Sequence, residues 1–348
     1  MNKLKNAWIT INRQCNLRCK WCYAESTEFK KTSDMSFALA KNVIDLIAEL
    51  KIEILSLTGG EPTCHTQIEE IIRYANSKKM NVTLVTNGLA LSDKHFLESL
   101  ISQGLTGVNL SIKGYSNKDY QKNTGVKAYD SVLKAINNVS VSNVDHIVSI
   151  VLSNENIDNY LYAVKDAVSN GAKAFYFSFE HDFSVLDGKD KTYDIRTVFD
   201  LINGFKNSYK ELDSITNGRF ILHQSLPICI WDKNFINVLN ERNQIVTSCQ
   251  LLERSGVIFD SDGSLIPCNF MYQVSLAKYG QDFFDRDSFL AFWNSPKVVN
   301  IYNQFCNHVG EKCYDCREAR YCGGGCLSNW YNFNYTELMN EFKLYNEM

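Results

Sequence analysis

Residues 8–22 read WITINRQCNLRCKWC, an apolar β-rich run followed at once by three cysteines with the spacing C-x3-C-x2-C. Thiolates are good ligands for the soft iron of iron–sulfur clusters and also for zinc. A structural zinc site needs a fourth ligand nearby, and none is apparent around Cys15, Cys19 and Cys22. Three cysteines on one loop leave one iron of a four-iron cluster without a protein ligand. Such an arrangement favours catalysis over a purely structural role.

The β-rich run at the start of this stretch is the first of six. These runs are Trp8–Asn12, Ile52–Leu57, Val82–Thr86, Val108–Ile112, Ile147–Leu152 and Phe175–Phe179. The helix-like stretches between them are Met35–Leu50, Thr66–Lys79, Leu91–Ser102, Tyr129–Asn138 and Ile157–Asn170. Strands that alternate with helices predict parallel βαβ units. Six units are fewer than the eight of a closed barrel, so the sequence predicts an α/β fold with a partial (β/α)6 barrel. Its site is expected at the carboxyl ends of the strands.

Three further features follow the predicted strands. Gly59-Gly60-Glu61-Pro62 comes after the second strand, Asn87 comes after the third, and Ser111 lies at the end of the fourth. A glycine pair lets the backbone approach a ligand closely, and a glutamate accepts hydrogen bonds from an ammonium or hydroxyl group. Because these features all fall at carboxyl ends of strands, we expect them to form one site with the cysteine loop.

The cysteine loop with the following Tyr23, together with the Gly-Gly-Glu-Pro segment, resembles the radical S-adenosylmethionine (radical SAM) enzymes over residues 6–180. The resemblance implies a [4Fe–4S] cluster held by Cys15, Cys19 and Cys22. The open iron would be chelated by the amino and carboxylate groups of the methionine moiety of S-adenosylmethionine. One electron would then cleave the sulfonium and give a 5′-deoxyadenosyl radical, which abstracts a hydrogen atom from the substrate.

The same resemblance implies which residues bind S-adenosylmethionine. In the glycine pair Gly59-Gly60, Gly60 would hold the methionine amino group together with Glu61. Tyr23 would contact adenine through its backbone, and Ser111 and Asn87 would lie near the ribose; these residues are Tyr23, Gly59, Gly60, Glu61, Asn87 and Ser111. Many relatives carry an arginine that faces the carboxylate where this chain has Lys122. Lysine can meet a carboxylate only as a point charge, and an exposed, solvated lysine is the alternative interpretation.

The composition limits the class of protein. The chain has 348 residues, of which 45% are apolar, and a formal net charge of −3. These values argue against wholesale disorder and offer no electrostatic reason to expect nucleic acid or an acidic membrane as a partner. Residues 1–8 lack the pattern of a signal peptide, and no run of 18 apolar residues occurs. We therefore expect a cytoplasmic protein whose 12 cysteines are reduced thiols.

After the sixth β-rich run the alternation of predicted strands and helices ends. Asp182–Asp194 is predicted to be a loop and Tyr193–Leu212 a helix. Gly256–Ile266 is predicted to form a hairpin around an Asp-Gly turn, and Ser288–Phe305 is predicted to be helical.

A second group of cysteines ends the chain. Its spacing C-x2-C-x5-C-x3-C, preceded by a cysteine and a Gly-x4-Cys element, resembles the C-terminal SPASM extension of some radical SAM enzymes; the cysteines are Cys249, Cys268, Cys313, Cys316, Cys322 and Cys326. The resemblance implies two auxiliary [4Fe–4S] clusters, and zinc is the alternative metal. The domains are expected to be a radical SAM core at 1–183, a helical connecting region at 184–247 and a SPASM auxiliary-cluster domain at 248–348.

Cys229 and Cys306 lie outside the resemblance and are candidates for the fourth ligands of the auxiliary clusters. Counting predicts that the first auxiliary cluster uses Cys249, Cys268 and Cys326 with Cys229, and that the second uses Cys313, Cys316 and Cys322 with Cys306. An open iron that binds substrate is the alternative in each case. Cys64 is expected to be a small buried apolar residue.

The sequence favours an enzyme. Glu180 and His181 follow the sixth strand and are candidates for a catalytic base, with a capping role as the alternative. The resemblance implies peptide modification, as a crosslink, an epimerisation or an oxidation. Oxidation of the sulfatase-maturing kind is disfavoured, because Asn269 stands where those enzymes carry an aspartate. The alternatives are a dehydrogenase or decarboxylase acting on a sugar or antibiotic precursor, and a non-catalytic metal-binding regulator.

The expected partners follow from this chemistry. The cluster needs an electron donor such as flavodoxin or ferredoxin. The segment before Trp8 is too short for a leader-binding domain, so a peptide leader would need a separate binding protein or the barrel rim.

Overall fold

The structure, a computed structural model, describes residues 4–29, 34–181, 194–307, 313–332 and 334–347. Eleven strands form one sheet in the order β11-β10-β9-β1-β2-β3-β4-β5-β6-β7-β8. They are β1 Asn6–Thr10, β2 Ile54–Thr58, β3 Asn81–Thr86, β4 Leu105–Ile112, β5 Asp145–Leu152, β6 Phe175–Phe179, β7 Phe220–His223, β8 Ile245–Val246, β9 Gly256–Phe259, β10 Ser264–Ile266 and β11 Ala277–Lys278.

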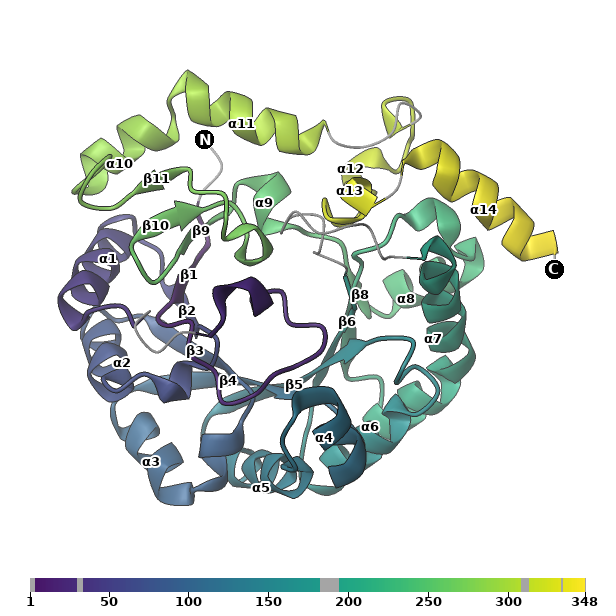
Figure 1. Cartoon of the computed structure of the whole chain (residues 1–348), viewed down its shortest axis with the longest axis horizontal. Helices are drawn as coiled ribbons and strands as arrows, with labels where there is room; N and C mark the ends of the chain where they lie inside the picture. Colours follow the sequence, from purple (N-terminus) through teal and green to yellow (C-terminus); the bar gives the residue numbers. More distant parts are fainter. Residues whose placement is uncertain (1–3, 30–33, 182–193, 308–312, 333, 348) are drawn as a thin grey trace.

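The neighbours from β9 through β1 to β8 all pair in parallel, whereas β10 and β11 are antiparallel. In Figure 1 the parallel strands curve around a central opening, with helices outside them. The predicted partial barrel and the predicted hairpin are therefore confirmed. The sheet also extends beyond six strands, because β7 and β8 come from the region expected to be a helical connection, and β9 joins the free edge of β1.

The α-helices lie outside this wall and along its open side (Figure 1). They are α1 Phe37–Glu49, α2 Ile68–Ser77, α3 Lys94–Ser102, α4 Asn117–Thr124, α5 Tyr129–Ser140, α6 Tyr160–Ser169, α7 Ile195–Thr216, α8 Lys233–Glu241, α9 Gln250–Glu253, α10 Arg286–Trp293, α11 Pro296–Cys306, α12 Ala319–Cys322, α13 Asn329–Asn332 and α14 Tyr335–Glu347. Short 3-10 turns occupy Glu25–Thr27, Pro62–Cys64, Leu89–Ser92, Ile228–Ile230 and Asn269–Met271.

One predicted helix proves to be two. The stretch Ser288–Phe305 contains two helices, α10 and α11, rather than one. The Ser295 side chain accepts a hydrogen bond from Val298 N, and Pro296 is the first residue of α11. A proline has no N–H to continue the preceding helix but fits the first turn of a new one. The expected loop at Asp182–Asp194 lies almost entirely outside the described residues.

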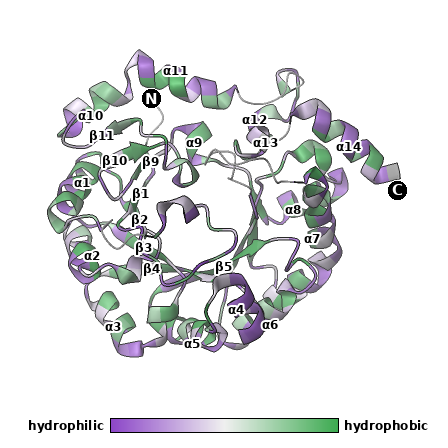
Figure 2. Cartoon of the chain, viewed as in Figure 1, coloured by the Kyte–Doolittle hydropathy of each residue, from purple (hydrophilic) through white to green (hydrophobic). Residues whose placement is uncertain are grey.

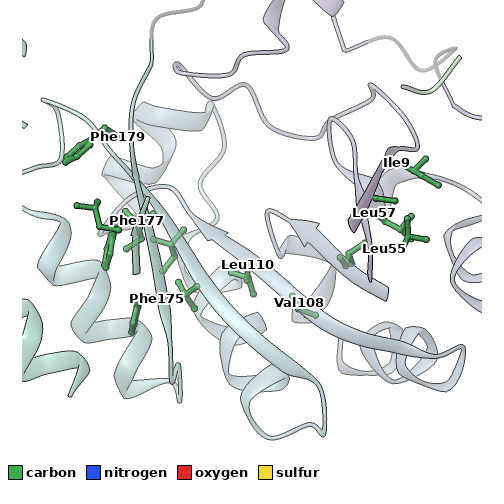
Figure 3. Close-up of a cluster of buried hydrophobic side chains, with 14 of the residues drawn as sticks. Ile9, Leu55, Leu57, Val108, Leu110, Phe175, Phe177 and Phe179 are labelled. Atoms are coloured by element: carbon green, nitrogen blue, oxygen red, sulfur yellow. The ribbon is translucent and has the colours of Figure 1, made fainter. Parts of the chain in front are cut away.

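The core lies between the sheet and its helices. Along β6 the buried positions alternate, and Phe177 packs against Tyr160 of α6 and Phe205 of α7, with ring centroids 5.7 and 6.1 Å apart. Figure 3 shows this row beside buried aliphatic side chains of β1, β2 and β4. In Figure 2 the strands are mostly hydrophobic and the outer helices have mixed faces. None of the described helices is both long and apolar enough to cross a membrane. The packed wall leaves the carboxyl ends of the strands free to carry loops.

Candidate functional site at the carboxyl ends of the strands

The loop after β1 extends over the central opening and carries the first three cysteines (Figure 1). Cys15, Cys19 and Cys22 are all half-buried. Leu17 N donates to Cys15 Sγ over 3.4 Å, and Cys22 N donates to Cys19 O over 3.1 Å. The thiols are thus carried on a folded turn. All twelve cysteines of the chain are described, and none is in a disulfide.

Helix α4 supports the other side of this loop. Arg18 N donates to Thr124 O over 2.8 Å, and Lys20 N donates to Asn123 O over 3.1 Å. The sequence did not predict α4, whose Ser116 N-cap accepts from Asp119 N and whose last residue is followed by Gly125 with a φ of 79°. The backbone of the cysteine loop is therefore fixed by two strong donors to one helix end.

The glycine pair after β2 packs on the cysteine loop. Gly60 N donates to Asn12 O over 3.0 Å, and Glu61 N donates to Gln14 O over 2.7 Å. A Cβ on Gly60 would lie 2.5 Å from Gln14 O, and one on Gly59 would lie 2.8 Å from Asn12 O. The close approach that the glycines permit is therefore an approach to the chain's own cysteine loop.

Glu61 joins the ends of β2 and β3. Its side chain is buried, and Oε1 accepts from Thr63 N over 3.1 Å, from Thr63 Oγ1 over 2.7 Å and from Thr86 Oγ1 over 2.6 Å. Oε2 accepts from Asn87 N over 2.7 Å. A carboxylate has about four acceptor positions. Three of the four bonds go to Oε1, whereas Oε2 accepts only one and keeps a position for an ammonium group from a ligand.

Both polar atoms of the Asn87 side chain are hydrogen-bonded. Its Nδ2 donates to Asn16 Oδ1 over 2.7 Å, and its Oδ1 accepts from Leu89 N over 3.0 Å. The side chain thereby links the end of β3 to the cysteine loop. Ser111, the other residue expected near a ribose, lies half-buried near the end of β4.

Two lysines near the site differ in environment. Lys122 is exposed, and its Nζ lies 3.0 Å from Glu155 Oε2, while Lys20 Nζ lies 3.0 Å from the other oxygen of the same carboxylate. This geometry favours the exposed alternative for Lys122. Burial raises the pKa of the Cys22 thiol, and the ammonium of Lys113 acts in the opposite direction. Lys113, which follows β4, is thus a cation that acts on the thiol loop.

Tyr120 of α4 lies beneath the loop. It is fully buried, and its Oη has no hydrogen-bond partner among the described residues. Burial raises the pKa of this hydroxyl, and negative charge at Cys19, Glu61 and Cys15 raises it further. An unsatisfied buried donor is costly, so its presence beside thiols fits a bound group that accepts a hydrogen bond there.

The thiols themselves also fit an iron–sulfur cluster. Burial raises the pKa of Cys15 to about 12, and the nearby Cys19 and Cys22 contribute to this shift. No three His, Cys, Asp or Glu side chains of the described chain converge on the position of a single metal ion. A four-iron cluster does not require such convergence, because each thiolate binds a different iron.

The hairpin region covers the far side of the loop. The edge of the Tyr23 ring meets Phe270, with centroids 5.1 Å apart, and burial raises the pKa of Tyr23 to about 12. Arg13 is buried, with Nη2 2.7 Å from Asp260 Oδ2, and its guanidinium lies over the Tyr272 ring. These contacts join the first cysteine loop to the segment that follows Cys268.

The two base candidates follow β6. Glu180 N donates to Leu152 O over 2.8 Å. The His181 ring lies 3.3 Å from Asn329 Oδ1 through Nδ1, and burial lowers the pKa of His181 to about 4. His181 is therefore neutral at pH 7.

The tail cysteines form two groups. Burial raises the thiol pKa of Cys268 and of Cys326; the charges of Cys326 and Cys249 add to the shift at Cys268, and the charge of Cys249 adds to the shift at Cys326. A cavity of about 890 Å³ brings together the others, which are Cys229, Cys306, Cys313, Cys316 and Cys322. Cys229 lines this cavity, whereas Cys249, Cys268 and Cys326, with which the sequence analysis placed it, do not. Cys64 is half-buried in the turn after Glu61, away from both groups.

Sequence reasoning missed Tyr120, Arg13 and Lys113. Tyr120 lies between Asp119 and Lys122 on α4. It is the one large hydrophobic residue of this amphipathic helix, and that pattern could have drawn attention to it. Arg13 is two residues before Cys15, but its partner Asp260 is distant in the chain and could not be foreseen.

A family model then decides the class of the first domain. The model described as the radical SAM superfamily matches residues 9–167, which include the end of β1, the cysteine loop, the glycine pair and β2 to β5. Residues 9–167 belong to the radical SAM superfamily. The superfamily is one of enzymes, and S-adenosylmethionine with a [4Fe–4S] cluster are its cofactors.

Curated relatives match little more than a third of this chain. The Fe-coproporphyrin III synthase of Methanosarcina barkeri is 32% identical over 129 residues, which is 37% of this chain and 32% of that protein. A probable GTP 3′,8-cyclase of Thermococcus kodakarensis is 30% identical over 131 residues, 38% of this chain and 42% of that protein. The chain thus covers less than half the length of these relatives.

Solved structures share the fold beyond the radical SAM domain. SuiB of Streptococcus suis, solved bound to the precursor peptide SuiA, has a TM-score of 0.70 at 19% identity and covers 96% of this chain and 74% of its own. The protein anSMEcpe, solved with bound S-adenosylmethionine, has a TM-score of 0.69 at 18% identity and covers 98% of this chain and 97% of its own. The fold likeness therefore includes the tail region.

Proposed function

We propose that this radical SAM enzyme modifies a ribosomally made peptide and that its tail holds two auxiliary [4Fe–4S] clusters of the SPASM type. The observation that carries the proposal is the pairing of one thiol loop at the barrel mouth with two further thiol groups in the tail. SuiB and anSMEcpe, which share the fold over nearly the whole chain, were each solved with a peptide bound.

Cys15, Cys19 and Cys22 would hold the cluster that binds S-adenosylmethionine. When bound, the cluster and S-adenosylmethionine together supply a 5′-deoxyadenosyl radical able to remove a hydrogen atom from the substrate. The chain's own part is to hold the thiols in place through α4 and the glycine pair, and to keep water away by burial.

The residues proposed to bind S-adenosylmethionine are Tyr23, Gly59, Gly60, Glu61, Asn87 and Ser111. Oε1 of Glu61 is filled by protein donors, whereas Oε2 accepts only from Asn87 N, so Oε2 is the oxygen that we propose for the methionine amino group. For the ligand carboxylate we favour Lys113 over Lys122, since Lys122 is held at the surface by Glu155.

The domain limits are proposed as 1–183 for the core, 184–247 for the connecting region and 248–348 for the auxiliary-cluster domain. The reductant would be a small electron-transfer protein such as flavodoxin or ferredoxin. A leader peptide would be bound by a separate protein or by the barrel rim. Twelve free thiols suit a reducing cytoplasm.

Glu180 and His181 are proposed to face the substrate. His181, with a pKa lowered to about 4 by burial, is neutral and a weak base at pH 7, so we propose that it hydrogen-bonds to the substrate and that Glu180 is the base. Asn269 lacks the carboxylate expected for oxidation of the sulfatase-maturing kind. We therefore favour crosslinking or epimerisation over that oxidation.

The test is anaerobic reconstitution, reduction with dithionite and assay for 5′-deoxyadenosine, with the peptide encoded beside the gene as substrate. A peptide mass lower by two hydrogens indicates crosslinking or oxidation. Deuterium uptake from solvent without mass loss indicates epimerisation. No nucleoside product would overturn the enzyme proposal and favour a metal-binding regulator.

A small-molecule substrate is the second candidate. The curated relatives of the radical SAM domain include a GTP 3′,8-cyclase and a coproporphyrin synthase, whose names describe small-molecule chemistry. Nucleoside formation that the peptide does not stimulate, in a gene neighbourhood of carbohydrate or antibiotic enzymes, would favour this candidate.

A further inference from the structure

We propose that Cys229, on the segment between β7 and α8, is the fourth thiolate ligand of the metal centre formed by Cys313, Cys316 and Cys322. This inference rests on the proposed auxiliary clusters and adds a ligand that the tail motif does not contain. Cys229 precedes the motif by more than 80 residues, so only the fold can bring it to the others.

The cavity of about 890 Å³ gives the first support. Its walls include all four of these cysteines, which come from the turn Ile228–Ile230 and from the tail. The other wall residues are largely apolar or aromatic, among them Trp231, Tyr321 and Trp330. A hollow with several thiols and few charges suits a thiolate-bound cluster better than a hydrated ion.

The backbone around Cys229 is attached to the tail. Cys326 N donates to Ser225 O over 2.7 Å, and Ile228 N donates to Cys322 Sγ over 3.4 Å. Gly325 has a φ of 77°, and a Cβ there would lie 2.6 Å from Ser225 O. The backbone of the tail and the backbone of the segment before Cys229 are therefore in close contact, and this contact fixes Cys229 beside Cys322.

Electrostatics agree with this placement. Although Cys229 is exposed toward the cavity, the surrounding protein desolvates its thiol and raises its pKa to about 12. The charges of Cys322, Cys313 and Cys316 raise it further. Cys229 therefore lies within electrostatic reach of all three tail thiols.

Cys306 also lines the cavity but is directed elsewhere. Its Sγ donates to Leu252 O over 3.6 Å, and its charge contributes to the raised pKa of Cys249. Cys306 thus belongs beside α9 and the first auxiliary group. This makes it a matched control, because it is an exposed cysteine of the same cavity.

The experiment uses the full chain in a C15A/C19A/C22A background, so that only auxiliary iron is counted after anaerobic reconstitution. Two four-iron clusters correspond to about eight iron ions and eight sulfides per chain. We expect C229A to reduce both counts toward about four, or to leave an iron that binds added cyanide with a changed electron paramagnetic resonance spectrum. Cys306→Ala, and Cys64→Ala outside the cavity, are expected to keep the second cluster and its spectrum.

Folding is checked by circular dichroism, and Cys229→Asp is a second variant that can still offer a ligand to iron. Restored iron with a shifted spectrum in C229D supports the proposal even where C229A is unstable. Full iron, an unchanged spectrum and no response to cyanide in C229A would overturn it.

A different result is expected if the tail does not hold iron–sulfur clusters. Zinc in place of iron and sulfide, bound in a Cys229-dependent manner, would support the ligand assignment and reject the iron–sulfur clusters. Loss of the second cluster in C306A but not in C229A would overturn the assignment and leave the clusters in place.

Discussion

The two thiol-rich regions of this chain are built in opposite ways. The first places Cys15, Cys19 and Cys22 on one turn, within eight residues of sequence. The second gathers thiols around a cavity from a wall segment and from a distant tail. A local site can be read from spacing alone, whereas a site assembled across the fold shows its full ligand set only in three dimensions.

The strongest contrast between the two regions is expected from removing the first set. C15A/C19A/C22A should abolish formation of 5′-deoxyadenosine, because the loop after β1 carries no other cysteine. The auxiliary iron and sulfide should remain, measured by chemical analysis and absorbance. Simultaneous loss of all iron would show that the two regions do not load independently.

The next largest effect is expected at Gly60. G60A places a Cβ 2.5 Å from Gln14 O, and a backbone atom cannot move aside as a side chain does. We expect a loss of about 1–3 kcal/mol in the free energy of unfolding, measured by denaturant titration, and poorer loading of the first cluster.

Gly280 provides the control for this prediction. It has a φ of 82° and no atom within 4 Å of its Cβ position, and asparagine tolerates that backbone conformation. G280N should stay near the wild-type stability. Equal losses in G60A and G280N would contradict the close-packing explanation.

At Tyr120 we expect smaller effects, which have opposite signs in the cluster-free chain and in the loaded protein. Y120F removes a buried hydroxyl that lacks a partner among the described residues, so the cluster-free chain should gain about 1 kcal/mol in unfolding free energy. The loaded protein should lose a hydrogen bond near the first cluster, which lowers its reduction potential in a spectroelectrochemical titration. An unchanged potential would show that the hydroxyl does not face the cluster.

The smallest effects separate two lysines. K113A should raise the KM for S-adenosylmethionine several-fold with a smaller change in kcat, because the Lys113 charge acts on the thiol loop. K122A should leave KM near its wild-type value, since that side chain is exposed and paired with Glu155. A reversed order would restore Lys122 as the ligand for the carboxylate.

The barrel was predictable because periodicity and strand ends are local signals. The six strands and the hairpin at the Asp-Gly turn follow from neighbouring residues. The break at Pro296 was missed because the apolar spacing continues across it, and β7 and β8 were missed because each is short.

The candidate site also contains features that local sequence signals predict and features that they do not. The cysteine loop and the glycine pair follow from spacing, but the glycines prove to serve backbone packing against Gln14. The contact of Arg13 with Asp260 and the position of Cys229 both join residues far apart in sequence. Such pairs depend on how β9 docks beside β1 and how the tail crosses the open side, which no single segment specifies.

The close packing of Gly325 on Ser225 suggests that the fold responds to the supply of iron. A metal centre that holds Cys229 together with the tail would act as a crosslink across a long loop, restricting the unfolded chain as a disulfide does. Unlike a disulfide, this crosslink would form in a reducing compartment and dissolve when iron is scarce or oxygen is present. The attachment of the tail to the barrel would then report the metal status of the cell, and starved protein would be the form most open to proteolysis.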